Sequence, residues 1–466
     1  MKYLQKKDNQ SFSHDVISGS ALDIFRSRAI VISNKMKTEK RMKKNVPIPH
    51  DILRSPKWEW HIPDASVASA VRTLDLKTGE LVKCSSVRAV YHCGDYFLKF
   101  EFGTNLLTSL RNRLHPKARQ EYKIGRNLAA AGIPAVECLG WGRLGGTNVL
   151  VTRALPGCVS VDEFYYTHIV CGGENPDMIV SEITAYLRKF FDAGFLHRDL
   201  HFGNILYDPD RHAFALVDLI EISRPGKLTD ADRKIMSRCI VTLRAGLNRA
   251  QMLHAIRAVG AADSDDEAEK YYFDEVRRTA WHLKMTWPKR RSQILNGYPK
   301  FMEAVPCPGA QLKTILLRKD WLSRPILTAD DIRDGIPAGY ERFVFKFPAL
   351  MKIPDVDEAN AHAAESIFLT SMCLQILRVR HRRVVAFIRP NELWLEPMPD
   401  GLTPAFPAPE DDRELKFFLR TLQKMMIEVE LQEDVRRLPN GFYYLQLVEG
   451  NQPTTVSMSV AYDIQP

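Results

Sequence analysis

Hydrophobic positions change their spacing along the chain, and this change predicts how the chain is organised. From residue 58 to about residue 138 they alternate with polar residues over short runs, which is typical of half-buried strands. Residues 86–91 and 96–100 are two such runs, and His92-Cys-Gly-Asp95 between them predicts a hairpin turn. Residues 178–193 instead repeat at helical spacing. We therefore expect a small β-rich region followed by a mainly helical one.

Two charged residues of the β-rich region fall at positions where the pattern predicts apolar surroundings. Lys99 lies between apolar neighbours in the second strand, where an ammonium group needs an anionic partner. A helix is predicted from Pro116 to Ala131, ended by Gly132-Ile-Pro134, and Glu121 lies on or beside its inward stripe. The pattern is compatible with a buried pair of Lys99 and Glu121, or with two separate surface charges.

The most informative stretch is His197-Arg-Asp-Leu-His-Phe-Gly-Asn204, which is followed by an apolar strand over 213–217 and then by Asp218. His-Arg-Asp-x-x-x-x-Asn is the catalytic-loop pattern of protein-kinase-like enzymes. Phosphoryl transfer requires an acceptor hydroxyl to be positioned and Mg²⁺ to be held against the phosphates. In this interpretation Asp199 takes the hydroxyl proton, and Asn204 and Asp218 bind Mg²⁺. We expect His197 to order the loop rather than to carry protons.

Composition and charge limit the class of protein. With 466 residues, 45% hydrophobic and 26% charged, the chain is expected to be a soluble protein of two to three domains. The formal net charge of +9 implies an acidic partner, such as a nucleotide, nucleic acid, an anionic membrane or a phosphorylated substrate, without choosing among them. Eight scattered cysteines predict neither disulfides nor a zinc site, and no apolar run is long enough to span a bilayer. We expect a reduced, cytoplasmic protein.

Residues 1–57 are polar and include a basic run over 35–44. This composition favours a solvated, partly disordered extension. The alternative is a segment that lies on anionic lipid headgroups, which attract clustered Lys and Arg side chains.

Several segments resemble the bacterial lipopolysaccharide core kinases, the family of heptose and Kdo kinases. They are Arg119–Leu128, Ala131–Gly142, Val149–Gly157, His197–Asp218, Leu228–Lys234, Asn248–Arg257 and Trp281–Arg291, so the resemblance covers roughly residues 80–300. It implies a bilobal α+β protein-kinase-like fold over 58–300, with a β-rich N-lobe (58–152) and a mostly helical C-lobe (153–300). It also implies ATP and Mg²⁺ as cofactors, a lipopolysaccharide-core sugar as acceptor, no nucleic acid, and a place at the cytoplasmic face of the inner membrane.

By this resemblance Lys99 matches the strand lysine of the family, Glu121 its helix partner, Asp199 the catalytic base and Asp218 the metal-binding aspartate. The family often has a different residue where this chain has Asn204. Asp-Leu-Ile-Glu follows the strand in place of Asp-Phe-Gly, and a glycine-rich phosphate loop is missing before Arg88. These departures leave the acceptor open. Alternatives are a kinase acting on protein or on a small molecule such as an aminoglycoside, or a non-catalytic pseudokinase scaffold.

Residues 301–466 are expected to form a separate α+β domain. Strands are predicted over 343–347, 384–388 and 393–395, and helices from about 356 and over 414–430; the chain closes on an apolar run at 456–463. The order of elements is that of a second, degenerate kinase-like fold or of an unrelated accessory domain. We assign it no catalysis, because the His-Arg-Asp pattern is lost there.

Overall fold

The structure is a computed structural model. It describes residues 49–224, 226–296, 302–305, 314–317, 339–344, 356–388, 391–406, 409, 411–429, 434–449, 452–453 and 456–458. The basic run at 35–44 lies outside these residues. The described chain divides into two compact units: unit 1 takes the residues up to Tyr122 together with Cys138–Ala154, and unit 2 takes Lys123–Glu137 together with the residues from Leu155 onward.

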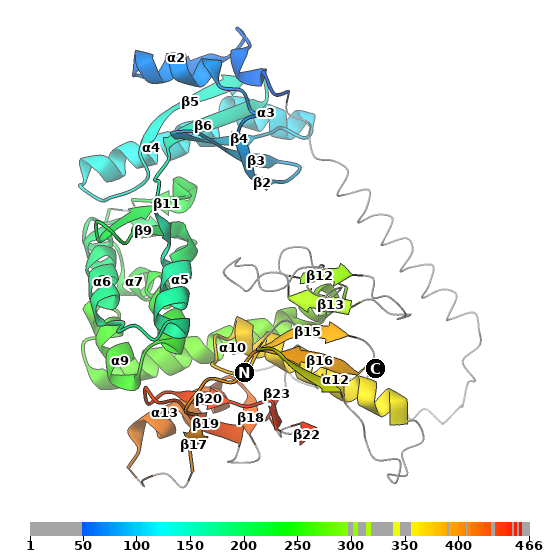
Figure 1. Cartoon of the computed structure of the whole chain (residues 1–466). Helices are drawn as coiled ribbons and strands as arrows, with labels where there is room; N and C mark the ends of the chain where they lie inside the picture. The colour runs from blue at the N-terminus through cyan, green and yellow to red at the C-terminus, as the bar shows by residue number, and fades with distance from the viewer. Residues whose placement is uncertain are drawn as a thin grey trace, which may run out of the picture. The chain divides into compact units, whose positions relative to one another are not determined.

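Unit 1 contains one antiparallel sheet of six strands in the order β1-β5-β6-β4-β3-β2 (Figure 1). The strands are β1 (Glu59–His61), β2 (Glu80–Cys84), β3 (Arg88–Cys93), β4 (Tyr96–Glu101), β5 (Cys138–Leu144) and β6 (Thr147–Arg153). The helices are η1 (Ile52–Arg54), α2 (Ala65–Thr73) and α3 (Leu106–Leu114), together with the residues of α4 (Lys117–Ala130) up to Tyr122. The sequence pattern therefore predicted the helix over 116–131 nearly to the residue.

The predicted hairpin is formed by β3 and β4, whose last paired residues are Cys93 and Tyr96. Gly94 in the two-residue turn has φ +56°, a conformation that glycine adopts without steric cost. The first strand begins at Arg88 rather than at Ser86, because the backbone N–H of Ser85 donates to the carbonyl of Arg88 and closes a turn there.

Alternation along β4 decides which side chains enter the core of unit 1. Leu98 and Phe100 are fully buried in the apolar cluster that α2 and η1 cover. Lys99 projects to the opposite face of the sheet, since successive side chains of a strand alternate. On α4 the buried positions Ala118 and Glu121 are three residues apart and therefore share one face of the helix.

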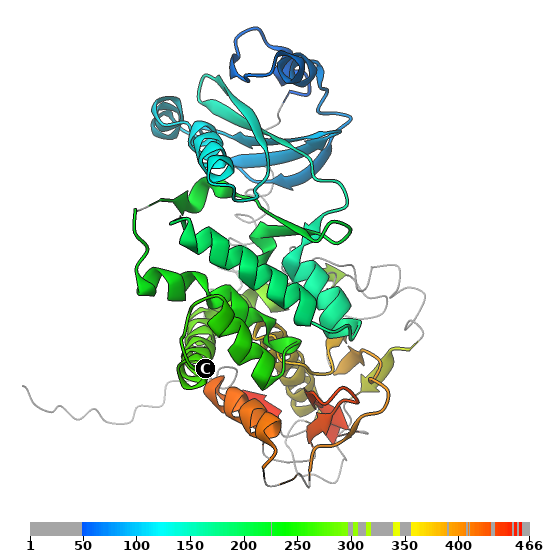
Figure 2. The same ribbon diagram turned by 90° about the vertical axis from the view of Figure 1, so that its left-hand side faces the viewer.

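Unit 2 begins with a mainly helical part, green in Figure 2. The helix predicted over 178–193 is α6 (Asp177–Asp192), and its apolar positions Ile179, Ile183, Tyr186, Leu187 and Phe190 are buried. The other helical elements are α5 (Val161–Phe164), η2 (Tyr165–Cys171), α7 (Asp230–Met236), α8 (Arg238–Val241), η5 (Thr242–Ala245), α9 (Arg249–Ala258) and α10 (Asp265–Leu295). Helix α9 packs against both α6 and α10. The α+β fold class predicted from the sequence is confirmed.

The C-terminal residues of unit 2 form a five-stranded sheet in the order β12-β13-β15-β16-β14. Its elements are β12 (Met302–Val305), β13 (Thr314–Leu317), β14 (Glu341–Val344), α12 (Val356–Ile376), β15 (Val384–Ile388) and β16 (Glu392–Leu395). In unit 1 the strand before the helix, β4, lies inside the sheet; here the corresponding strand, β14, lies at its edge. If these residues repeated the small lobe, β14 would lie inside its sheet as β4 does. The observed strand order therefore favours the interpretation that residues 301–466 form an unrelated accessory domain. Residues 345–347 of the predicted strand lie outside the described residues.

The helix predicted over 414–430 is shorter than expected. Helix α13 spans Arg413–Lys424, and β18 (Ile427–Val429) follows it and pairs with β23 (Val456–Met458). Met426 between them has φ +60°, a left-handed conformation that ends a helix. The prediction was wrong because the pairing of β18 with a distant strand overrides the helical spacing of the sequence. Beyond Met458, the predicted apolar run lies outside the described residues.

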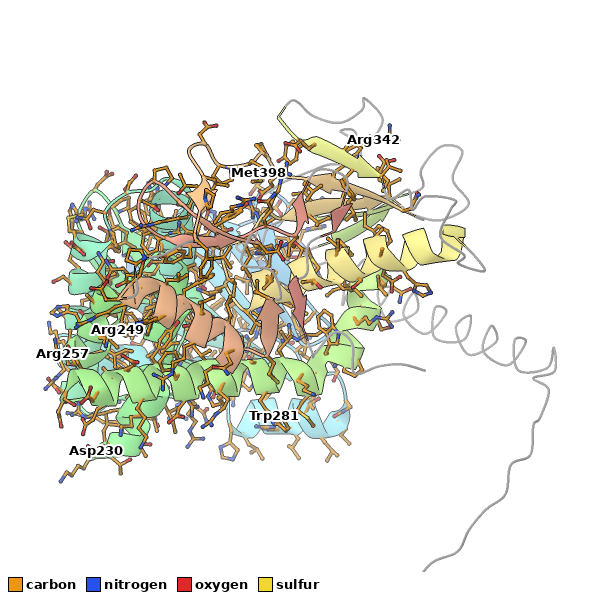
Figure 3. All side chains as sticks on the ribbon, turned by 90° about the horizontal axis from the view of Figure 1, so that it is seen from below. Asp230, Arg249, Arg257, Trp281, Arg342 and Met398 are labelled. Atoms are coloured by element: carbon orange, nitrogen blue, oxygen red, sulfur yellow. The ribbon has the colours of Figure 1, made fainter. Side chains whose placement is uncertain are left out.

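The C-terminal elements pack on α10 and on the helices before it. The rings of Tyr272 on α10 and Phe417 on α13 stack with centroids 4.7 Å apart. Arg249, at the start of α9 (Figure 3), and Arg420 both bind Glu269, at 2.6 Å and 3.0 Å. Accordingly, α13 is fixed to α9 and α10 by one aromatic stack and one shared carboxylate. Among the described residues, no helix is both long and apolar enough to cross a bilayer.

Candidate active site

Lys99 and Glu121 meet inside unit 1, as one of the two sequence interpretations predicted. The Nζ atom of Lys99 lies 2.9 Å from each carboxylate oxygen of Glu121. Both side chains are largely withdrawn from water, with 15% of the lysine side chain and 6% of the glutamate side chain exposed. Two short charge-assisted hydrogen bonds fix the direction of the ammonium group far better than a surface pair would. Strand β4 and helix α4 therefore hold a well-oriented cation.

A second ion-pair cluster occupies the end of the same sheet. The guanidinium of Arg88 donates to Glu101 at 3.0 Å, and Nζ of Lys117 lies 3.5 Å from the same carboxylate. Residues 85–87, which join β2 to β3, form a short turn without glycine. Unit 1 thus brings together Lys99 and Glu121, the lysine and glutamate that the sequence resemblance singled out, and the turn before β3 contains no glycine-rich loop.

The catalytic-loop pattern is held in unit 2 between two pairs of short strands. Strand β8 (Leu196–His197) pairs with β11 (Ile222–Ser223), and β9 (Ile205–Asp208) pairs with β10 (Ala213–Leu216). Asp199 follows β8 and is exposed, whereas Asn204 ends the single turn η3 (Phe202–Asn204) immediately before β9. The side-chain amide of Asn204 donates to the backbone carbonyl of Asp199 at 3.1 Å. Asp199 and Asn204, five positions apart in the sequence, are therefore held in one loop by a hydrogen bond.

Asp218 is brought to the same end of this hairpin. The backbone N–H of Val217 donates to the carbonyl of Asn204 at 3.0 Å, one step beyond the paired residues Ile205 and Leu216. Asp218 itself has φ +54° and ψ +55°. A left-handed backbone is uncommon for a residue with a side chain, and such strain concentrates at functional sites. Asn204 directly precedes β9, and Asp218 lies two residues after the end of β10. The pairing of these strands therefore places both residues at the same end of the hairpin.

His197 is a buried support of this loop. The backbone N–H of Asp199 donates to Nδ1 of His197 at 3.2 Å, and the ring is 1% exposed. Burial lowers the pKa of His197 to about 4, against opposing effects of the carboxylates of Asp199 and Asp218. The ring is therefore neutral near pH 7, with Nδ1 as the acceptor. This geometry agrees with the expectation that His197 orders the loop.

Two residues of the loop, Asn204 and Asp218, would suit a magnesium ion. Among the residues that the structure describes, no three His, Cys, Asp or Glu side chains come together as a metal site. Mg²⁺ in phosphoryl-transfer sites needs only one or two protein ligands, because phosphates and water complete its octahedral shell. Asn204 offers its side-chain oxygen once its amide nitrogen is bonded to Asp199, and Asp218 offers a carboxylate. This donor set fits Mg²⁺ and not a zinc ion.

The segment that contains these residues is similar to a known protein family. Residues 83–243 match the model of the lipopolysaccharide kinase (Kdo/WaaP) family. This part of the chain is therefore similar to the kinases of that family. It contains all five site residues predicted from the sequence, namely Lys99, Glu121, Asp199, Asn204 and Asp218.

The other two comparisons add little to the kinase-family match. A solved structure described as a divergent kinase that lacks the glycine-rich loop and regulates membrane ultrastructure of the Toxoplasma parasitophorous vacuole is 16% identical to this chain, with a TM-score of 0.26. That match covers 38% of this chain and 66% of the other. No curated protein matches the sequence.

Two residues beside the kinase loop were missed by the sequence analysis. Asp162, on α5, accepts hydrogen bonds from the guanidinium of Arg378 at 2.9 Å and 3.1 Å. A Cβ atom added to Gly203, within the loop, would lie 4.0 Å from the same carboxylate. The C-terminal residues are therefore tied to the helix on which the loop rests. No local signal could have predicted a pair 216 positions apart in the sequence.

Proposed function

We propose that the protein transfers the γ-phosphoryl group of ATP to a sugar hydroxyl of the lipopolysaccharide inner core, on a heptose or Kdo residue. The observation that carries this proposal is the lipopolysaccharide kinase family match, which spans the bidentate Lys99–Glu121 pair and the loop of Asp199, Asn204 and Asp218.

Each residue has a distinct part in the proposed reaction. Lys99 binds nucleotide phosphates, and Glu121 keeps its ammonium group in place. Asn204 and Asp218 hold Mg²⁺. When bound, Mg²⁺ neutralises charge on the phosphate oxygens.

Asp199 is the proposed proton acceptor. As the acceptor oxygen forms its bond to the γ-phosphorus, the hydroxyl proton passes to the Asp199 carboxylate and the bond to the ADP oxygen breaks. The exposed position of Asp199 at the start of the loop leaves its carboxylate accessible to a large, polar acceptor. Neutral, buried His197 bonds to the Asp199 backbone and does not compete for this proton.

The acceptor class accounts for the proposed location. A lipopolysaccharide precursor is anchored in a membrane by its lipid part, so the enzyme works at the cytoplasmic face of the inner membrane as a peripheral protein. The net charge of +9 favours an encounter with such an anionic surface.

The test is incubation of the purified full-length chain with γ-labelled ATP, Mg²⁺ and one of three acceptors. These are delipidated, dephosphorylated lipopolysaccharide cores, an aminoglycoside and a generic protein substrate. We expect label in the core sugars and none in the other two. Label in the aminoglycoside or the protein alone would replace the proposed acceptor by one of the alternatives considered above, and failure to bind nucleotide would indicate a pseudokinase.

A further inference from the structure

Helix α3 of unit 1 exposes its apolar face. Leu106, Leu107, Leu110 and Leu114 are 84%, 79%, 51% and 63% exposed. At 3.6 residues per turn these four positions fall within an arc of about 100°. Four neighbouring leucines in water differ from the scattered single apolar residues that are normal on protein surfaces, and such a patch indicates a binding surface.

Two uncharged polar residues of α3, Ser109 and Asn112, face the sheet instead. Asn112 is buried, and its side-chain amide donates to the carbonyl of Gly146 at 3.1 Å. The side chain of Asn148, in turn, donates to the carbonyl of Asn112 at 3.1 Å. Ser109 lies so close to the loop that a Cβ atom added to Gly146 would be 2.7 Å from the Ser109 Cβ. The helix is thus seated on the sheet by its polar face.

Helix α3 is held firmly in this orientation, because its first turn is capped. The side chain of Asn105 accepts from the backbone N–H of Thr108, and the Thr108 hydroxyl oxygen accepts from the backbone N–H of Asn105. This capping box fixes where the helix starts. Because two hydrogen bonds and the cap hold α3 in place, the leucines remain outside in the folded protein.

Charge at the same helix identifies the partner. Arg111, Arg113 and His115 are all exposed. The sequence from residue 102 to residue 120 contains no Asp or Glu. An amphipathic helix with leucines on one face and arginines beside them is suited to the boundary between anionic lipid headgroups and acyl chains. A stable protein interface, in contrast, takes about 20–30 residues from each partner, which is more than this helix offers.

We propose that α3 docks unit 1 on an anionic lipid surface, with the four leucines entering the headgroup boundary and Arg111 and Arg113 contacting lipid phosphates. The inference deepens the proposed function by naming the surface at which a lipid-anchored acceptor is met. It does not depend on phosphoryl transfer, since docking is measured without ATP.

The experiment is sedimentation of the full-length chain with vesicles of phosphatidylcholine alone or mixed with phosphatidylglycerol. We compare the wild type with Leu106→Ser/Leu107→Ser/Leu110→Ser and with Arg111→Gln/Arg113→Gln. The control is Ile235→Ser on α7, because Ile235 is also exposed but is accompanied by Asp230 and Asp232. All substituted side chains face solvent, so the melting temperatures are expected to match that of the wild type.

We expect wild type and the Ile235 control to bind the mixed vesicles. The serine variant should lose about tenfold or more of its partitioning to both vesicle types, and the glutamine variant should lose its preference for the anionic ones. The proposal would be overturned if the serine variant bound both vesicle types as strongly as the wild type. It would also be overturned if the wild type formed dimers that the serine substitutions dissociate. Phosphorylation of a delipidated acceptor should be the same for all variants, so a failure of docking leaves the proposed kinase activity separately testable.

Discussion

The side-chain nitrogen of Asn204 lies 3.1 Å from the backbone carbonyl oxygen of Asp199 and donates a hydrogen bond to it. This bond gives the two ends of the amide different tasks in the proposed reaction: the nitrogen holds the loop, and the oxygen is the proposed ligand of Mg²⁺. A carboxylate has no N–H to donate, so an aspartate at this position would place negative charge against the carbonyl.

Asn204→Asp is therefore expected to lower kcat/KM for MgATP about 10- to 100-fold and to raise the Mg²⁺ concentration needed for half-maximal rate. The matched control is Asn175→Asp, because Asn175 uses only its side-chain oxygen, which accepts from the backbone N–H of Asp177. Magnesium titrations of both variants provide the check. If Asn204→Asp gave the same magnesium titration curve as the wild type, the side-chain amide would neither hold the loop nor bind Mg²⁺.

Variants of the Lys99–Glu121 pair should affect stability and activity differently. Lys99→Met removes the ammonium group that pairs with the largely buried carboxylate of Glu121, which should cost about 3 kcal/mol in the free energy of unfolding. Lys99→Met/Glu121→Gln removes both charges and should recover most of that loss. Neither variant should support phosphoryl transfer, because the ammonium group is missing. Denaturant unfolding and ATP turnover give the two measurements; recovery of turnover in the double variant would argue against a role of Lys99 at the phosphates.

The low pKa of His197 predicts a pH dependence of stability. Its pKa is about 4 in the folded protein because of burial, whereas an unfolded histidine has a pKa near 6.5. Between these values the unfolded chain binds a proton that the folded chain does not, so stability is full above about pH 6.5 and falls as the pH is lowered toward 4. The difference corresponds to roughly 3 kcal/mol.

Replacement by a residue that does not titrate should flatten this region of the curve. His197→Asn is expected to be less stable than wild type near pH 7, since a shorter side chain leaves space in the core, but to lose less stability between pH 6.5 and 4. Melting temperatures recorded across this range test the sign. A variant whose melting temperature falls as steeply as that of the wild type would assign the acid transition to other groups.

The Arg378–Asp162 pair should matter more for stability than a comparable pair on the surface. Its side chains are 19% and 16% exposed. Arg342 (Figure 3) also donates to both carboxylate oxygens of its partner, Glu392, but the Arg342 side chain is 62% exposed. We expect Arg378→Gln to cost about 1–3 kcal/mol and Arg342→Gln less than about 1 kcal/mol. Denaturant unfolding measures both. Equal losses would mean that the C-terminal residues are not held to α5 by this contact.

The sequence was most informative where local spacing determines the contact. Lys99 is directed away from the core by strand alternation, and Glu121 lies on the inward stripe of α4, so two periodicities predicted that these side chains could meet. Asp199 and Asn204 are only five positions apart, and one turn and one hydrogen bond suffice to join them. The roles given to these residues in the reaction stay predictions until the assays are done.

The sequence was least informative where contacts between distant segments of the chain determine the structure. The end of α13 at Lys424 depends on the pairing of β18 with β23. The edge position of β14 depends on its pairing with β16, some 50 residues further on. Helix α3 shows a third limit: its leucines repeat as in a core helix, and only the seating of Asn112 against Gly146 reveals that they face outward. Periodicity finds the apolar face of a helix but not what covers it.

The most direct test compares Asp199→Asn with Asp210→Asn in γ-phosphoryl transfer from ATP to lipopolysaccharide cores. Both substitutions turn an exposed carboxylate into an amide, but Asp210 belongs to the turn between β9 and β10. The account predicts that Asp199→Asn lowers the transfer rate about 100-fold or more, since a positioned base is lost, and that Asp210→Asn transfers at the wild-type rate. Undiminished transfer by Asp199→Asn would contradict it.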